Sequence, residues 1–160
     1  MAVKAIPPGY EKKVTPYLIV RGGAKAIEFY KQALGAVERT RMQMPDGRIG
    51  HAEVDIDGAV VMLGDEMPEM GITGPESLGG TTVGMLLYVA DVDARFDRAV
   101  KAGATVKRPV VDQFYGDRSG TITDPFGHQW TIATHKEDLT MEEMKARMDK
   151  AMETMCQEAG

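Results

Sequence analysis

The order of secondary-structure signals along the chain occurs twice, and this repetition is the strongest constraint on the fold. Each half has a β-rich stretch, a helical pattern with apolar residues on one side, a glycine and three more β-rich stretches. An offset of about 69 residues aligns Leu18 with Leu87 and Ile27 with Phe96. The repetition predicts an α+β fold of two tandem βαβββ modules. The alternative is a ferredoxin-like α+β domain whose halves are similar by chance.

The first module is expected at about 13–64. Asp-Gly pairs, which tolerate the positive φ of tight hairpins, separate its last three strands, and Gly35 ends its helix. Its predicted elements are a strand at 13–20, a helix at 23–34 and strands at 36–44, 48–56 and 59–64.

The second module is expected at about 82–135, after a connector at 65–81 that is rich in Gly and Pro and lacks periodicity. The connector is interpreted as a linker or a lid. The second module's predicted elements are a strand at 82–90, a helix at 91–102 and strands at 104–111, 117–124 and 128–134. Together with a C-terminal helix, the modules are expected to form a single domain over residues 1–160.

The C-terminal helix is predicted at about 140–156. Thr140 and Glu143 have the spacing of a capping box at its start. Methionines recur on one face of this helix, which favours docking on the sheet or on a partner subunit because Met fills irregular gaps. A thioether Cu(I) site is an alternative use of the same residues. The stripe consists of Met141, Met144, Met148, Met152 and Met155.

Charge and composition exclude several classes of protein. The 160 residues carry a net charge of −5, so a nucleic-acid partner, which needs a basic face, is not expected. No run of 18 apolar residues and no signal-peptide core is visible, so no membrane partner is expected. The only cysteine, Cys156, has no intrachain partner and favours a reducing compartment, which predicts a cytoplasmic location.

Several strings resemble the vicinal-oxygen-chelate superfamily of glyoxalase, bleomycin-resistance and dioxygenase proteins, and especially its PhnB-like branch. The matching strings are TPYLIV, AIEFYKQALGA, MPDGRIGHAEVDI, VMLGDEMPEMG, SLGGT, LYVADVDARFDRAVKAGATV, DQFYGDRSGTITDPFGHQW and IATHKEDLT. The resemblance implies a curved mixed-sheet cup with helices on the outside, a small-molecule ligand and a homodimer. It does not specify a reaction, because one fold supports many chemistries.

The resemblance also implies where metal ligands would lie, namely on the first and last strand of each module. These positions fall on Thr15, Met62, Gly84 and Thr131. None of them offers the imidazole or carboxylate that a divalent ion prefers. No metal ligand and no cofactor is therefore predicted, and Thr15, Tyr17, Met62 and Thr131 are interpreted as ligand-binding positions.

Strand alternation selects candidate catalytic residues in the first module. Ala52 and Val54 should face the helix layer, whereas His51 and Glu53 should face the opposite side of the sheet. A histidine beside a carboxylate is a possible acid/base pair. The alternative is a solvated sheet face on which both side chains have ordinary partners.

In the second module, Gln113, Tyr115 and Asp117 lie where a strand meets a loop, and they are interpreted as ligand-binding residues. By alternation, Asp117 should point away from Arg118, and the alternative role for Asp117 is a turn held by hydrogen bonds to the backbone. Trp130 is expected in the core, whereas His135 is expected on the surface.

Three functions fit these features. The first is a metal-independent small-molecule-binding protein. The second is a lyase or isomerase for a small carbonyl compound, with His51 and Glu53 as acid/base or as relocated metal ligands. The third is an assembly protein that uses the methionine-rich helix.

Overall fold

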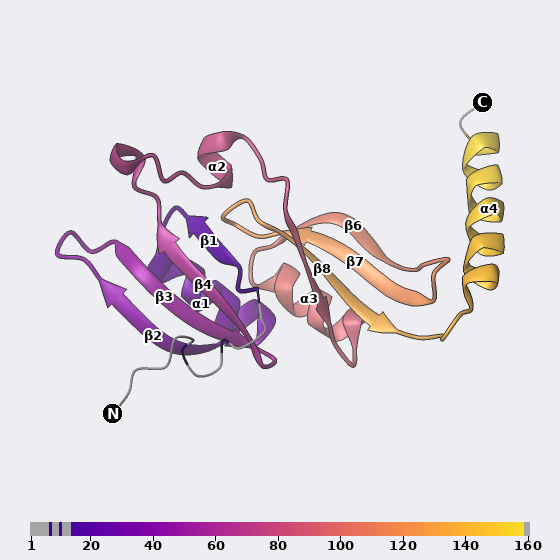
Figure 1. Ribbon diagram of the computed structural model, residues 1–160, viewed down its shortest axis with the longest axis horizontal. Coiled ribbons are helices and arrows are strands. Elements are labelled where there is room, and N and C mark those ends of the chain that lie inside the picture. The colour runs from indigo at the N-terminus through magenta and orange to yellow at the C-terminus, as the bar shows by residue number, and fades with distance from the viewer. Residues whose placement is uncertain (1–6, 8–9, 11–13, 159–160) are drawn as a thin grey trace. The chain divides into compact units, whose positions relative to one another are not determined.

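The computed structural model describes Pro7, Tyr10 and residues 14–158, and it describes side chains only as far as residue 154. It divides into two compact units, residues 1–80 and 81–160 (Figure 1). The first residue of the strand predicted at 13–20, and the side chains of Met155 and Cys156, lie outside the described part.

Unit 1 contains a four-stranded mixed sheet with strand order β1-β4-β3-β2 and a helix that follows the first strand. Strand β1 runs parallel to β4, and the other neighbours are antiparallel. The elements in chain order are β1 (Tyr17–Val20), α1 (Gly23–Leu34), β2 (Val37–Gln43), β3 (Ile49–Ile56) and β4 (Ala59–Asp65).

Helix α1 covers one face of this sheet. Its buried stripe includes Ile27, Tyr30 and Leu34, none of which is exposed to solvent. The sheet contributes Ala52 and Val54 to the same core, and both are fully buried. The alternation expected for β3 is therefore confirmed: every second side chain packs under the helix, and the others face away from it.

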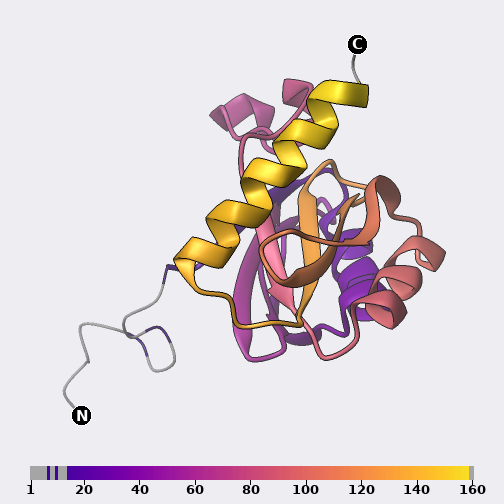
Figure 2. The same ribbon diagram turned by 90° about the vertical axis from the view of Figure 1, so that its right-hand side faces the viewer.

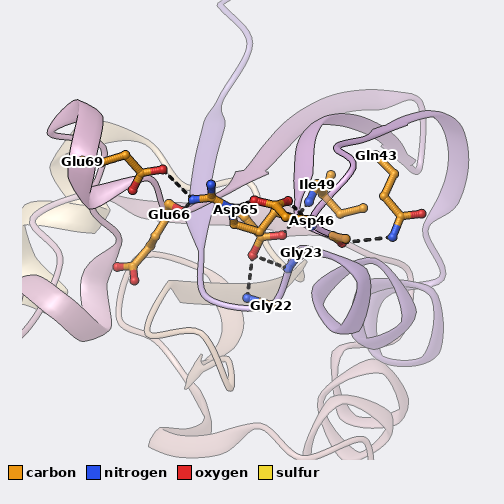
Figure 3. Close-up of polar contacts among 10 residues, drawn as sticks. Gly22, Gly23, Gln43, Asp46, Ile49, Asp65, Glu66 and Glu69 are labelled. Atoms are coloured by element: carbon orange, nitrogen blue, oxygen red, sulfur yellow. Dashed lines mark hydrogen bonds and ion pairs between the residues drawn. The ribbon is translucent and has the colours of Figure 1, made fainter.

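The carboxylate of Asp65, at the end of β4, fixes the start of α1 (Figure 3). Asp65 Oδ1 accepts hydrogen bonds from the backbone N–H groups of Gly22 and Gly23 at 2.7 and 2.8 Å. Its Oδ2 accepts one from Ile49 N at 2.7 Å. The first N–H groups of a helix have no partner within the helix, so this buried carboxylate satisfies them and joins α1 to two strands.

The connector contains two short helical turns, η1 (Pro68–Met70) and α2 (Pro75–Leu78), where the sequence predicted no regular structure. Glu66 is only 8% exposed and links two parts of the connector to the residue that follows β1. Its carboxylate accepts hydrogen bonds from Gly74 N at 2.7 Å and from Arg21 Nε at 3.2 Å. A lid function for the connector stays a prediction.

Unit 2 repeats the architecture, with strand order β5-β8-β7-β6 and a parallel β5–β8 pair. Trp130 lies in its core, as predicted, and its Nε1 donates to Asp124 Oδ2 at 3.0 Å. The elements are β5 (Gly84–Tyr88), α3 (Val92–Lys101), β6 (Thr105–Asp112), β7 (Asp117–Thr123) and β8 (Gln129–His135). The prediction of an α+β fold with two tandem βαβββ modules is confirmed.

Helix α4 (Met141–Glu158) follows the second module as one uninterrupted helix (Figure 2). The predicted capping box is present: Thr140 N donates to Glu143 Oε2 at 2.9 Å, and Glu143 N donates to Thr140 Oγ1 at 3.2 Å. Within the described residues, no helix combines the length and the apolar character needed to cross a membrane.

Candidate functional site

The sheet face of unit 1 opposite α1 carries most of the candidate residues of the first module. The strand register places Tyr17 of β1 beside Met62 of β4, Met62 beside Glu53 of β3, and Glu53 beside Thr40 of β2. These four side chains therefore form one row across the whole sheet. His51 lies on the same face, two residues before Glu53, as predicted.

A chain of polar contacts joins Tyr17, His51 and Glu53. The Tyr17 hydroxyl lies 2.9 Å from His51 Nδ1, and the two rings are 5.6 Å apart at a tilt of 46°. His51 Nε2 lies 3.4 Å from Glu53 Oε1. Because a carboxylate only accepts, a neutral His51 would donate from Nε2 to Glu53 and accept at Nδ1 from the Tyr17 hydroxyl. The sequence predicted the His51–Glu53 pair but not the hydroxyl that completes it.

Gly64 of β4 makes room for the tyrosine. A Cβ atom at this position would lie 3.5 Å from the Tyr17 hydroxyl and only 3.1 Å from the carbonyl oxygen of Gly50. A side chain here would therefore press against the Gly50 carbonyl and touch the Tyr17 hydroxyl. The short residue and the long aromatic residue together place the hydroxyl over β3.

The electrostatic surroundings keep Glu53 ionised. The Tyr10 hydroxyl, and then His51, lower the pKa of Glu53 below its ordinary value. The Tyr10 hydroxyl is itself buried beside Glu53 and makes no well-aligned hydrogen bond, and contact with Glu53 raises its pKa. Burial raises the pKa of Tyr17, so its hydroxyl stays protonated at neutral pH. The cluster thus combines a proton donor, an imidazole and a carboxylate.

The four positions where the superfamily would hold a divalent metal do not fit one. Thr15 precedes β1, Met62 lies in the open-face row, and Gly84 has no side chain. Thr131 Oγ1 is hydrogen-bonded to Thr121 Oγ1 at 3.0 Å. Among the described residues, no three or more His, Cys, Asp or Glu side chains are grouped so that they could hold a metal ion.

Asp117 lies on the open face of the unit 2 sheet, as the sequence predicted. Its partners are two side chains rather than the backbone of a turn. It is only 6% exposed. The Tyr88 hydroxyl donates to its Oδ2 at 2.6 Å, and His135 Nδ1 lies 2.8 Å from its Oδ1. Arg118 points to the opposite face, as expected, and binds Asp93 and Asp112.

His135 is exposed, as predicted, but it is also bound on both sides. Its Nε2 lies 3.0 Å from Asp138 Oδ1, so both ring nitrogens face carboxylates. Asp117, and then Asp138, raise the pKa of His135. The hydrogen bond to Asp117 likewise raises the pKa of Tyr88. Neither residue was predicted as part of a site, because only the strand register brings the ends of β5, β7 and β8 together.

The remaining candidates of the second module lie at the loop between β6 and β7. The Tyr115 hydroxyl lies 3.4 Å from Ser119 Oγ, and Gln113 Nε2 donates to the Ser119 carbonyl at 3.5 Å. Phe114, which the sequence reasoning missed, meets Tyr115 edge to face with ring centroids 5.2 Å apart. The prediction that Gln113, Tyr115 and Asp117 bind a ligand stays a prediction.

Comparisons with known proteins agree with this architecture. The uncharacterised protein Rv0887c of Mycobacterium tuberculosis is 46% identical over 142 residues, which cover 86% of this chain and 83% of that protein. The crystal structure of the Arabidopsis thaliana At5g48480 product is 28% identical, has a TM-score of 0.64, and covers 76% of this chain and 98% of its own. A PhnB protein from Bacillus cereus shares the fold, with a TM-score of 0.61 at 15% identity over 77% of this chain and 99% of its own.

The family comparison covers most of both modules. The family model of the glyoxalase/bleomycin resistance protein/dioxygenase superfamily matches residues 13–132, which extend from the strand before α1 into β8. The matched segment includes every candidate residue except His135 and those of α4. The chain belongs to the glyoxalase/bleomycin resistance protein/dioxygenase superfamily.

Proposed function

We propose that this protein binds a small organic molecule without a metal ion, on the open face of the unit 1 sheet. The observation that carries the proposal is the contact chain Tyr17–His51–Glu53 beside Met62. It supplies donors and acceptors next to an apolar surface on a sheet face that α1 does not cover. Such a mixture of apolar surface and a few converging polar groups is typical of ligand sites.

The exposure of these side chains also supports binding. Tyr17 is 48% exposed, and the side chains of His51 and Glu53 are 27% and 19% exposed. A half-exposed aromatic ring can give up more solvent contact when a ligand covers it, which makes the apolar contribution to binding favourable. The polar chain would then fix the ligand's orientation. An aromatic compound with a carbonyl or hydroxyl group has the matching chemistry.

This function can be tested with fluorinated aromatic fragments that carry carbonyl or hydroxyl groups, observed by ¹⁹F NMR in the presence of EDTA. We expect the ¹⁹F resonances of some fragments to broaden when the wild-type protein is added. The substitutions Tyr17→Phe and His51→Gln should reduce that broadening. Arg118→Gln changes a side chain of unit 2 that binds Asp93 and Asp112 away from the open faces, and it should leave the broadening intact. The proposal is wrong if no fragment binds, if all variants bind equally, or if binding requires an added divalent cation.

The geometry also favours a second candidate function, a lyase or isomerase for a small carbonyl compound. Tyr17, His51 and Glu53 form a continuous path for a proton, which a purely structural sheet face does not need. His51 would remove a proton from the carbon beside the carbonyl, with Glu53 orienting its ring and stabilising its charged form. The Tyr17 hydroxyl could then donate to the carbonyl oxygen.

Turnover distinguishes the two candidates. The hemithioacetal of methylglyoxal and glutathione is a suitable carbonyl substrate to assay. If the protein is an enzyme, His51→Ala should lower the rate by about a hundred-fold or more while folding survives. Measurable binding of fragments with no turnover of this substrate would leave binding as the better supported function.

We also propose a homodimer, which the resemblance to the superfamily implies, and a cytoplasmic location, which the single cysteine favours. Light scattering on the purified chain would test the first, with a mass near twice 17.4 kDa expected for a dimer. A monomer at all accessible concentrations would contradict it.

A further inference from the structure

We propose that unit 2 has a second binding site, for an aromatic or apolar organic cation, between the first turns of α4 and the end of the sheet. The inference rests on the proposed function only in that the chain binds small molecules, since all the residues of this site lie in the other unit. The sequence predicted Tyr115 and Asp117 as ligand-binding residues but did not predict that α4 would form the other side of a pocket with them.

The pocket has a volume of about 880 Å³, within the range for drug-sized ligands. Its apolar walls come from two sides. The sheet and the β6–β7 loop supply Tyr88, Phe114 and Tyr115, and α4 supplies Met141, Met144 and Met148. The first three methionines of the predicted stripe therefore line a cavity. Tyr88 is 52% exposed and Phe114 is 37% exposed, so the pocket is open to solvent.

The aromatic side of the pocket is held in place by contacts beneath it. The Gly116 carbonyl accepts hydrogen bonds from Lys136 N and Glu137 N, both at 3.0 Å, which fixes the loop to the exit of β8. Tyr115 is held against Ser119, and Tyr88 against Asp117. A ligand would thus meet rings that are already oriented, which lowers the entropic cost of binding.

The charges around the pocket favour a cation. Asp117 and Glu142 both line it, and no ion pair to another described residue is found for Glu142. The two basic side chains that line the pocket are already paired, His135 with Asp117 and Asp138, and Lys145 with Asp149 at 3.0 Å. When the partners Asp138 and Asp149 are included, four carboxylates surround the pocket against two basic side chains. An organic cation is therefore attracted to the pocket, and an anion is repelled.

The apolar residues favour the same ligand class. A cation over the face of Tyr or Phe is attracted by the ring quadrupole, and flexible thioethers adapt to flat aromatic bodies. Tyr88, Phe114 and Tyr115 bring three aromatic rings to one pocket. This gives the methionine stripe of α4 a role that does not require a partner subunit or a copper ion.

Two fluorescent dyes of opposite charge test the proposal. Thioflavin T is a flat aromatic cation, and 8-anilinonaphthalene-1-sulfonate is an aromatic anion. We expect thioflavin T to bind the full chain more tightly than the anionic dye. Met144→Gln should weaken thioflavin T binding about ten-fold, because it removes apolar contact at the centre of the wall. Glu142→Gln should weaken it about five-fold through the lost charge.

Met152→Gln is the matched control, since Met152 lies on the same helix, is 58% exposed and is outside the pocket. It should leave thioflavin T binding unchanged. The proposal is overturned if the anionic dye binds as well or better, or if Met152→Gln weakens binding as much as Met144→Gln. If thioflavin T fails while the fluorinated fragments still respond to His51→Gln, only this second site is wrong. If both tests fail, the proposed function is wrong as well.

Discussion

Asp65 and Thr134 occupy the same place in the two modules, and each fixes the first turn of its module's helix to the last strand. Asp65 accepts hydrogen bonds from Gly22 and Gly23 at the start of α1. Thr134 Oγ1 accepts one from Val92 N at the start of α3, at 2.9 Å, and donates to the Val89 carbonyl at 2.8 Å. One position thus performs one structural task with two different side chains, which is direct evidence of the repeated module.

The two anchors should differ in their contribution to stability. We expect Asp65→Asn to lower the free energy of unfolding by about 3 kcal/mol, because a buried carboxylate that accepts three N–H bonds would be replaced by an amide that repels at least one of them. Thr134→Val should cost about 1–2 kcal/mol, since it removes two hydrogen bonds. Urea unfolding measures both. Equal losses would contradict this assignment.

Because α1 lies close to β3, we expect that Gly23 does not tolerate a larger residue. A Cβ atom at Gly23 would lie 2.8 Å from Ile49 Cβ and 2.9 Å from Asp65 Oδ2. Gly23→Ala should therefore destabilise the protein by about 2 kcal/mol, although alanine is the better helix former. Gly84→Ala is the control, because nothing lies within 4 Å of a Cβ there. Its unfolding free energy should stay within about 0.5 kcal/mol of the wild type. A neutral Gly23→Ala would show that α1 can shift away from β3.

Glu38 of β2 predicts a measurable acid dependence. Arg41 and then Lys31, at 2.8 and 2.7 Å, lower the pKa of Glu38 to about 2. A carboxyl group whose pKa is lower in the folded than in the unfolded state stabilises the fold at pH values above its unfolded pKa. This contribution disappears as the pH falls towards about 2. Glu38→Gln should cost about 1 kcal/mol at neutral pH, after allowance for solvent screening. Its unfolding curve should approach that of the wild type in acid. A gap that stays constant with pH would contradict the ion pairs.

His135 predicts the opposite dependence. Its pKa is raised by Asp117 and Asp138, so the contribution is present below the ordinary value of about 6.5 and is lost as the pH rises through the raised value. Relative to His135→Gln, the wild type should lose stability as the pH rises from about 6.5 through the raised pKa of His135. Urea unfolding across this range, with His135→Gln as the reference, gives the measurement. Parallel curves for the two proteins would show that the aspartates do not bind the imidazolium.

Much of the fold follows from local patterns in the sequence. The alternation of β3 placed Ala52 and Val54 in the core, and the parity of β8 placed Trp130 there. Both predictions depend only on the two-residue period of a strand and on which face is apolar. The capping box of Thr140 and Glu143 was equally local, and its hydrogen bonds are present.

The candidate sites were predictable only in part, because they depend on contacts between distant segments. His51 and Glu53 are two residues apart, so the sequence could pair them, whereas Tyr17 reaches His51 across another strand. Tyr88, Asp117 and His135 meet only through the register of three strands. The methionine stripe was visible in the sequence. Nothing local indicated that its first members line a pocket together with the β6–β7 loop.

Because the Asp117 carboxylate joins Tyr88 and His135, it links the ends of β5, β7 and β8 in one small network. A ligand that draws either partner away would loosen two strand termini at once, whereas one that leaves the network intact would shield them from solvent. Amide hydrogen exchange at the final residues of β5 and β8 should therefore distinguish a ligand of unit 2 that disrupts this network from one that leaves it intact. The measurement does not need a signal from the ligand itself.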